Sequence, residues 1–192
     1  MNERTKRNII IFSIVLVAVL GLTSLIALAI EPDEGVTFKL VISGTGEEIE
    51  FSGYAMDQDV KLVSNVSGIE TDNLFTGGDL YVINPAIKTA STVETPSVPS
   101  RDSSDWIDYL SEPARINPAN FHSLIGAVSS VNGIVTFGAS PQITAKFNAG
   151  VLTELRIPSR SSEAVYSYSD VSASNSVKAS DFAVPSGYLV TE

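Results

Sequence analysis

The chain of 192 residues contains no cysteine and a single histidine, His122. The absence of cysteine excludes disulfide bonds, thiolate zinc sites, cysteine nucleophiles and membrane attachment through an acylated cysteine. A serine hydrolase would need the histidine beside a nucleophile on a sharp turn, yet no Gly-x-Ser-x-Gly motif occurs. Glu48 and Glu50 share one face of an alternating stretch, which is typical of a solvated strand face rather than a glycosidase pair. We therefore expect no catalytic site, metal site or cofactor, and do not interpret the chain as an enzyme.

Basic residues are scarce after the first seven positions. Residues 31–192 hold nine Lys and Arg against 21 Asp and Glu, which gives this part of the chain a formal charge of −12. Phosphate backbones are bound by clustered basic side chains and repel a domain of this charge. Nucleic acid is therefore not expected as a partner, and the acidity is interpreted as a solvated surface.

Charge is absent altogether from residues 8–30. A helix of this length, rising about 1.5 Å per residue, can cross the roughly 30 Å hydrocarbon layer of a bilayer. Basic residues precede the run and acidic residues follow it. The positive-inside rule then predicts a cytoplasmic basic tail at 1–7, a single-pass transmembrane anchor or uncleaved signal at 8–30, and an extracytoplasmic domain at 31–192 in the cell envelope. Because Ala27-Leu28-Ala29 has the small-x-small form of a signal-peptidase site, the domain is secreted instead if the chain is cleaved near Ala29.

From residue 36 onward, apolar and polar residues alternate in short runs that are separated by turn residues, which predicts strands. Before the middle of the chain, we expect strands at 36–43, 47–54, 60–66, 69–75, 80–83 and 87–93. Later strands are expected at 134–139, 142–147, 151–157, 163–169, 177–184 and 188–191. Short connections between them indicate an antiparallel meander, because parallel neighbours need long crossovers.

The Pro- and Ser-rich loop at 95–104 interrupts this series, and a helical insert is expected at 104–132. A short helix is predicted at 105–110, and Pro113 follows it. A longer amphipathic helix is predicted at 118–131, with one apolar stripe made of Phe121, Leu124, Ile125 and Val128. The predicted fold class is α+β, with a large antiparallel sheet and one or two helices.

Three stretches resemble a known family: Gly-Gly-Asp-Leu-Tyr-Val-Ile-Asn-Pro at 77–85, the hairpin Ala-Lys-Phe-Asn-Ala-Gly-Val-Leu-Thr-Glu-Leu at 145–155, and Ser-Asp-Phe-Ala-Val-Pro-Ser-Gly-Tyr at 180–188. Their pattern and order are similar to those of the LolA-type lipoprotein carriers and the LppX/LprG-type envelope lipoproteins. The resemblance implies a strongly curved sheet, an open half-barrel, with helices across its concave face and acyl chains held between them. The chain departs from these lipoproteins because it lacks their acylated cysteine and has only residues 31–35 between the apolar run and the first strand, where the carriers place a long helix.

The resemblance also implies that apolar side chains of the concave face line a groove. The candidates for this groove are Phe38, Leu40, Phe51, Tyr81, Ile83, Phe121, Leu124, Phe137, Phe147, Tyr166 and Tyr168. Alternation alone gives the same pattern for a filled core, so two functions remain open. The first is a membrane-tethered, non-catalytic carrier that binds a lipid, acyl chain or other hydrophobic ligand. The second is an envelope interaction or sensor module with a filled core and a protein partner. A cavity of about 300 Å³ or more between sheet and helices would favour the first.

Overall fold

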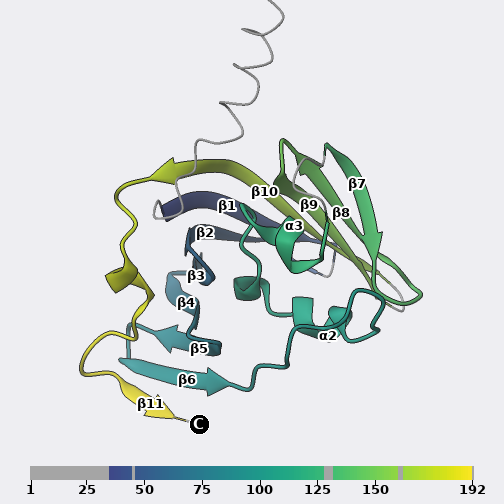
Figure 1. Cartoon of the computed structure of the whole chain (residues 1–192). Helices are drawn as coiled ribbons and strands as arrows, with labels where there is room; N and C mark the ends of the chain where they lie inside the picture. The colour runs from purple at the N-terminus through teal and green to yellow at the C-terminus, as the bar shows by residue number, and fades with distance from the viewer. Residues whose placement is uncertain (1–34, 45, 128–131, 160–161, 192) are drawn as a thin grey trace, which may run out of the picture. The chain divides into compact units, whose positions relative to one another are not determined.

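A computed structural model describes residues 35–44, 46–127, 132–159 and 162–191 (Figure 1). The chain divides into two compact units, residues 1–32 and residues 33–192, and all the described residues belong to the second. No helix in this described part is long and apolar enough to cross a membrane. The anchor predicted at 8–30 lies outside the described residues.

The first half of the domain is an antiparallel meander of six strands. These are β1 (Gly35–Ser43), β2 (Ile49–Met56), β3 (Asp59–Val66), β4 (Ile69–Thr76), β5 (Asp79–Asn84) and β6 (Thr89–Val93). Each strand pairs with the next, as the alternating pattern predicts. Gly77 and Gly78 form the β4–β5 turn with φ of 60° and 91°, which a two-residue hairpin turn requires and glycine adopts without strain.

The second half adds five strands to the same sheet. They are β7 (Gly133–Phe137), β8 (Ile143–Asn148), β9 (Val151–Pro158), β10 (Glu163–Ser174) and β11 (Leu189–Thr191). The strand order is β11-β6-β5-β4-β3-β2-β1-β10-β9-β8-β7, so β1 lies inside the sheet, between β2 and β10. Among the described strands, only β11 runs parallel to its neighbour, β6. The described part of the chain therefore has the predicted α+β class, built on one large and mostly antiparallel sheet.

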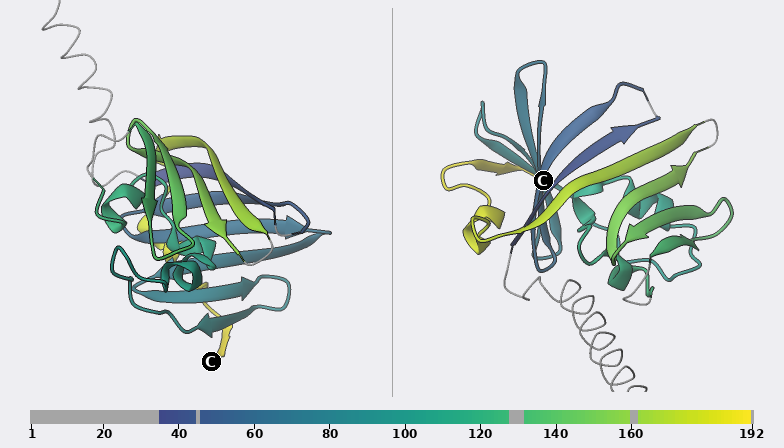
Figure 2. Two further views of the ribbon diagram at one scale, coloured as in Figure 1. Left: turned by 90° about the vertical axis from the view of Figure 1, so that its right-hand side faces the viewer. Right: turned by 90° about the horizontal axis from the view of Figure 1, so that it is seen from above.

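A helical insert connects β6 to β7. It consists of α2 (Trp106–Leu110), the 3₁₀ turn η1 (Pro113–Arg115) and α3 (Phe121–Leu124). The sheet curves around this insert, which lies on its inner side (Figures 1 and 2). We call the side of the sheet that holds the insert the inner face and the opposite side the outer face.

The helix expected at 118–131 is shorter than predicted. It is α3, which ends at Leu124, because Gly126 has a φ of 67°. The amide of Ala127 donates to the carbonyl oxygen of His122, and the amide of Gly126 donates to that of Ser123, which is the Schellman pattern that ends a helix at a left-handed glycine. Val128, the last residue of the predicted stripe, lies outside the described residues.

The strand expected at 177–184 is also absent from the described structure. Residues Ala179–Phe182 instead form the 3₁₀ turn η2, in which the backbone amide of Lys178 donates to the carboxylate of Asp181 at 2.8 Å. The buried apolar side chains of this segment, Val177 and Phe182, are five residues apart and do not alternate. The segment passes over the outer face, where η2 contacts β3 and β4.

Two separate hydrophobic clusters result from this arrangement. The inner cluster lies between the sheet and the insert, and its buried members include Leu40, Leu62, Trp106, Phe121 and Phe137. The outer cluster lies between the sheet and the segment after β10, and its buried members are Leu74, Ile83, Ala90, Val177 and Phe182. Strands β4 and β5 therefore contribute apolar side chains to both faces of the sheet.

Candidate functional site

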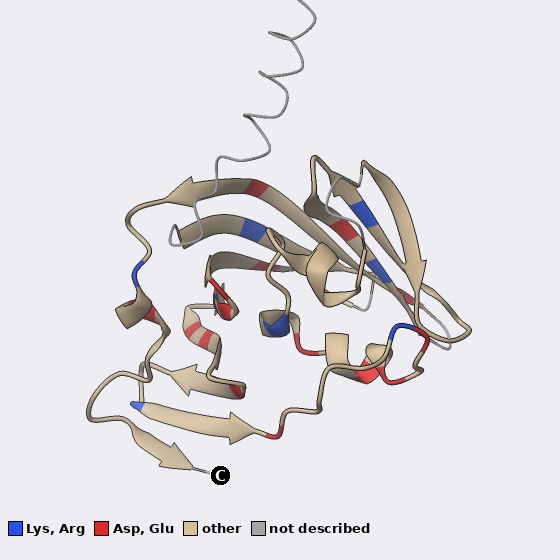
Figure 3. Ribbon diagram, in the orientation of Figure 1, with Lys and Arg blue, Asp and Glu red and all other residues tan. Residues whose placement is uncertain are grey.

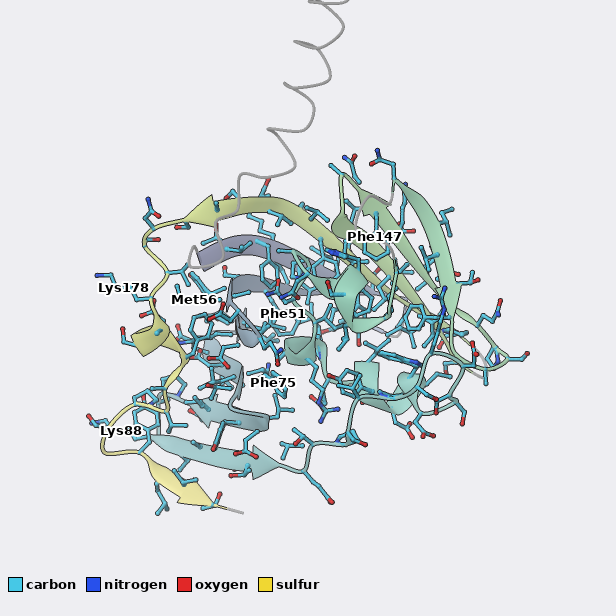
Figure 4. The ribbon with its side chains drawn as sticks, viewed as in Figure 1. Phe51, Met56, Phe75, Lys88, Phe147 and Lys178 are labelled. Carbon is cyan, nitrogen blue, oxygen red and sulfur yellow. The ribbon has the colours of Figure 1, made fainter. Side chains whose placement is uncertain are left out.

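The structure brings nine of the eleven candidate residues together in the inner cluster. Eight of them are at most 6% exposed: Phe38, Leu40, Phe51, Phe121, Phe137, Phe147, Tyr166 and Tyr168. The ninth, Leu124, is half-buried at the edge of the cluster. Figure 4 shows Phe51 and Phe147 among the side chains on the inner side of the sheet.

Tyr81 and Ile83 lie apart from the other candidates. In β5, Leu80 joins the inner cluster, whereas Tyr81 and Ile83 belong to the outer cluster, where Phe182 packs. Tyr81 pairs across the sheet with Leu74, another outer residue. The hairpin at 77–91 therefore forms part of the sheet, but its apolar side chain on the inner face is Leu80 and not Ile83.

Aromatic rings fill much of the inner face. The centre of the Phe137 ring lies 5.1 Å from the centre of the Trp106 ring and 6.1 Å from that of the Phe121 ring, and both pairs have edge-on geometry. Phe121 in turn stacks on Phe147 at 6.5 Å. Such pairs are close-packed, so most of the candidate side chains form a core and not an open surface.

Open space is found at one side of this packed region. A cavity of about 480 Å³ lies between β4, the β2–β3 turn and the insert; we call it the insert pocket. Its apolar wall consists of Phe75, Val98, Tyr109, Phe121 and Leu124, and its polar wall consists of Gln58, Arg115, Asn117, Asn120 and Ser123. Phe121 and Leu124 are the two candidate residues that reach it. Phe75, labelled in Figure 4, packs on the inner cluster from β4.

Hydrogen bonds hold the insert against the sheet and so fix the shape of the insert pocket. The side-chain amides of Asn117 and Asn120 both donate to the carbonyl oxygen of Asp57 in the β2–β3 turn, at 3.0 and 2.9 Å. The Oδ1 atom of Asn117 accepts from the amide of Ala119. On the other side of α3, the ring of His122 lies 3.1 Å from the carbonyl oxygen of Gly150. His122 therefore has a structural contact in the β8–β9 turn.

Arg115 is the one basic residue among the pocket residues, and it is 6% exposed. Its guanidinium donates to two backbone carbonyl oxygens, that of Tyr109 at 3.1 Å and that of Glu94 at 3.3 Å. It also lies 5.4 Å from the centre of the Tyr109 ring, within the range of a cation–π contact. Burial raises the pKa of Tyr109, and the Arg115 charge opposes part of that rise.

A second cavity, of about 220 Å³, lies between α2, β1, β9 and β10. Its lining includes Ile42, Ile107, Ile157 and Tyr166. Tyr166 is the candidate residue that reaches this cavity. Of these two cavities, the insert pocket combines apolar walls with a buried charge, so we take it as the candidate site.

Sequence reasoning did not include eight of the ten residues of the insert pocket, among them Phe75, Val98, Tyr109 and Arg115. Val98 lies in the Pro- and Ser-rich loop, and a loop residue enters a wall only through tertiary folding. Arg115 did carry a signal, because it is the one basic residue between Arg101 and Lys146 and is flanked by Ala114 and Ile116. A lone cation in an apolar context is usually paired or functional when it is buried.

Comparison with known proteins adds no assignment. No protein-family model matches the chain, and no curated protein matches it. The resemblance to LolA- and LppX-type proteins therefore stays a prediction. Within the described ranges, no three His, Asp or Glu side chains come together as metal ligands.

Proposed function

We propose that residues 31–192 form an extracytoplasmic half-barrel of LolA/LppX type, tethered to a membrane by residues 8–30, that binds a lipid or other hydrophobic ligand without catalysis. The observation that carries this proposal is the insert pocket. Its volume of about 480 Å³ falls within the roughly 300–1,000 Å³ of small-molecule sites. It lies between the curved sheet and the insert, which is where carriers of this type hold acyl chains.

The walls of the insert pocket favour an apolar ligand of limited size. Phe75, Phe121 and Leu124 offer apolar surface, and each CH₂ group that a ligand buries there contributes about 0.8 kcal/mol before ordering costs. The packed rings of Phe121, Phe137 and Phe147 close the inner face beside the pocket. A single chain therefore suits the site better than a lipid with several chains.

The packed inner face also supports a second function, an envelope interaction or sensor module that binds a protein partner. Exposed acidic residues gather around α2, where Asp102, Asp105 and Asp108 occur at every third position (Figure 3). A surface of one sign steers partners of opposite charge. On this reading the insert pocket is a packing defect, and a basic protein surface binds near α2.

Photocrosslinking to an acyl probe separates the two functions. The full-length chain is placed in phosphatidylcholine nanodiscs and exposed to a fatty acid that carries a diazirine in its chain, and labelled residues are mapped by mass spectrometry. We expect labels on the peptides that hold Phe75, Phe121 and Leu124. Leu124→Gln should lower this labelling several-fold, because it places an unpaired amide in the apolar wall. Val135→Gln is the matched control, because Val135 is also half-buried against the inner cluster but does not line the pocket.

The result that contradicts carriage is the absence of label from the pocket peptides while the nanodisc scaffold protein is labelled. Equal losses for Leu124→Gln and Val135→Gln would contradict the assignment of the pocket wall. The tether is tested separately: we expect the full-length chain to fractionate with membranes, with its domain open to protease only from the outside. A mature chain that begins at Ile30 in the soluble fraction would replace the anchor by a cleaved signal.

A further inference from the structure

Arg115 is a buried cation without an acidic partner among the described residues. Among the described residues, no carboxylate lies within 4.0 Å of its guanidinium. Its Nε atom is buried and has no hydrogen-bond partner there. The two backbone carbonyl oxygens that it contacts carry only partial charge, so the full positive charge is not neutralised.

Asp72 provides a comparison within the same domain. Asp72 and Arg115 are the two buried charged residues of the described chain, each 6% exposed. Asp72 forms an ion pair with Lys61 at 2.9 Å, which offsets the cost of its burial. Arg115 has no such pair in the described part of the chain, although the acidic residues of the sequence outnumber the basic ones. A buried charge without a partner is costly, so the missing counter-charge indicates that something else supplies it.

The position of Arg115 indicates where that counter-charge belongs. Arg115 forms part of the polar wall of the insert pocket, and the apolar side chains of Phe75, Tyr109 and Leu124 line the same space. A guanidinium presents its N–H groups in a planar fork that matches the oxygens of a carboxylate or a phosphate. A cation and an apolar wall in one cavity together fit a molecule with an anionic end and an apolar chain.

We propose that the insert pocket binds an amphiphile with one acyl or alkyl chain and an anionic head group, carboxylate or phosphate, that pairs with Arg115. This inference rests on the proposed function and specifies its ligand class. The head group binds at η1, and the chain lies against Phe75 and Leu124. The exposed side chains of Gln58 and Ser123 add polar groups to the same wall.

The test compares probes that share one chain and differ in the head group. Full-length chain in phosphatidylcholine nanodiscs is crosslinked with a diazirine-bearing fatty acid, the matching alkyl phosphate and the matching fatty alcohol. Labelling of the pocket peptides is divided by labelling of the nanodisc scaffold protein, which corrects for different membrane partitioning. We expect the acid, the phosphate or both to label the pocket at least tenfold more than the alcohol. Labelling by one anion and not the other identifies the head group.

A variant then connects the preference to Arg115. Arg115→Met should reduce labelling by the anionic probes to the level that the alcohol reaches on the same variant. Arg115→Lys keeps the charge and loses the planar fork, so it should retain part of the preference. Circular dichroism shows whether each variant is folded. If Arg115→Met is unfolded, the three probes on the wild-type chain still decide whether the pocket prefers an anionic head group, and Arg115→Lys tests the role of Arg115.

The outcomes distinguish this inference from the proposed function. Equal labelling of the pocket by all three probes would overturn the anionic head group and leave hydrophobic-ligand binding intact. A preference that persists in folded Arg115→Met would assign the head group to another residue and overturn the role of Arg115. Absence of label from the pocket with every probe would overturn the proposed function itself.

Discussion

The hydroxyl of Tyr166 in β10 donates a hydrogen bond of 3.1 Å to the carbonyl oxygen of Leu110, the last residue of α2. Tyr168, two residues later on the same face, is equally buried, but its hydroxyl has no partner in the described structure. The hydroxyl groups of the two tyrosines therefore differ in this hydrogen bond. We expect Tyr166→Phe to lower the free energy of unfolding by about 1 kcal/mol, because it leaves a buried carbonyl unpaired.

Tyr168→Phe is the matched control for that change. It removes a buried hydroxyl that pays a desolvation cost without a hydrogen bond, so we expect no loss of stability and a gain of up to about 1 kcal/mol. Urea denaturation of both variants measures the difference. Equal destabilisation by the two substitutions would contradict the hydrogen-bond assignment.

Alkaline pH should destabilise the domain through its buried tyrosines. Burial raises the pKa of Tyr166 to about 12, and the charge of Glu112 adds to the rise. Burial also raises the pKa of Tyr109 and, more strongly, that of Tyr168. Because the folded state favours the neutral form, its stability is fully present below the ordinary tyrosine pKa of about 10 and is lost as the pH rises through the folded pKa.

The measurement is the free energy of unfolding as a function of pH, with tyrosinate absorbance followed in parallel. We expect the stability of the wild-type chain to fall between about pH 10 and pH 12. Tyr166→Phe should have a shallower fall, since one raised pKa is removed. A free energy of unfolding that rises between these pH values would contradict the raised pKa values of the buried tyrosines in the folded state.

Gly53 in β2 is covered by the ring of Phe38, its partner in β1. A Cβ atom at position 53 would overlap three atoms of that ring, and the inner cluster leaves the ring little room to move. Gly53→Ala should therefore cost about 1 to 3 kcal/mol, despite the usual gain from replacing glycine in a strand. Urea denaturation of Gly53→Ala, Phe38→Leu and the double variant gives the coupling energy. A stabilising Gly53→Ala, or additive effects, would show that the ring yields without cost.

Phe182 is the largest buried side chain that the segment after β10 contributes to the outer cluster, and it is 3% exposed. Phe182→Ala should cost about 3 to 5 kcal/mol, as truncation of a buried aromatic ring does. Leu189→Ala, in the same part of the chain but 64% exposed, should change stability by less than about 0.5 kcal/mol. Thermal or urea denaturation of the two variants tests whether the outer face holds a true core. A small effect of Phe182→Ala would mean that the segment detaches readily.

Most of the strands were predictable, although not the segment at 177–184, because alternation and turn residues are local signals. The turn at Gly77-Gly78 needs a positive φ at both positions, and glycine supplies it regardless of tertiary context. The face to which β5 turns Ile83 was not predictable, because Leu80 and Ile83 are both apolar and both faces of the sheet are covered. Alternation specifies a face only where one side is polar.

The insert was less predictable than the sheet. The apolar stripe from Phe121 to Val128 has helical spacing, but Gly126 ends α3 after one turn, and the backbone geometry of a glycine outweighs such a pattern in a short segment. The burial of Arg115 depends on contacts with Tyr109 and with Glu94, 21 residues away. Such a site arises from tertiary packing, which a local pattern does not encode.

The pairing of β1 with β10 has a consequence for the order of folding. Thr37 and Ser172, whose hydroxyl groups lie 3.2 Å apart across these strands, are separated by 135 positions in the chain. Contacts at such separation fold slowly, because the loop between them must be closed before they form. During synthesis, β2 pairs with β1 early, while the opposite edge of β1 has no partner until β10 leaves the ribosome. Until then, the emerging chain presents an unpaired edge with Leu40 and Val41 at its centre, and this edge is the point at which a second nascent chain or a chaperone would bind.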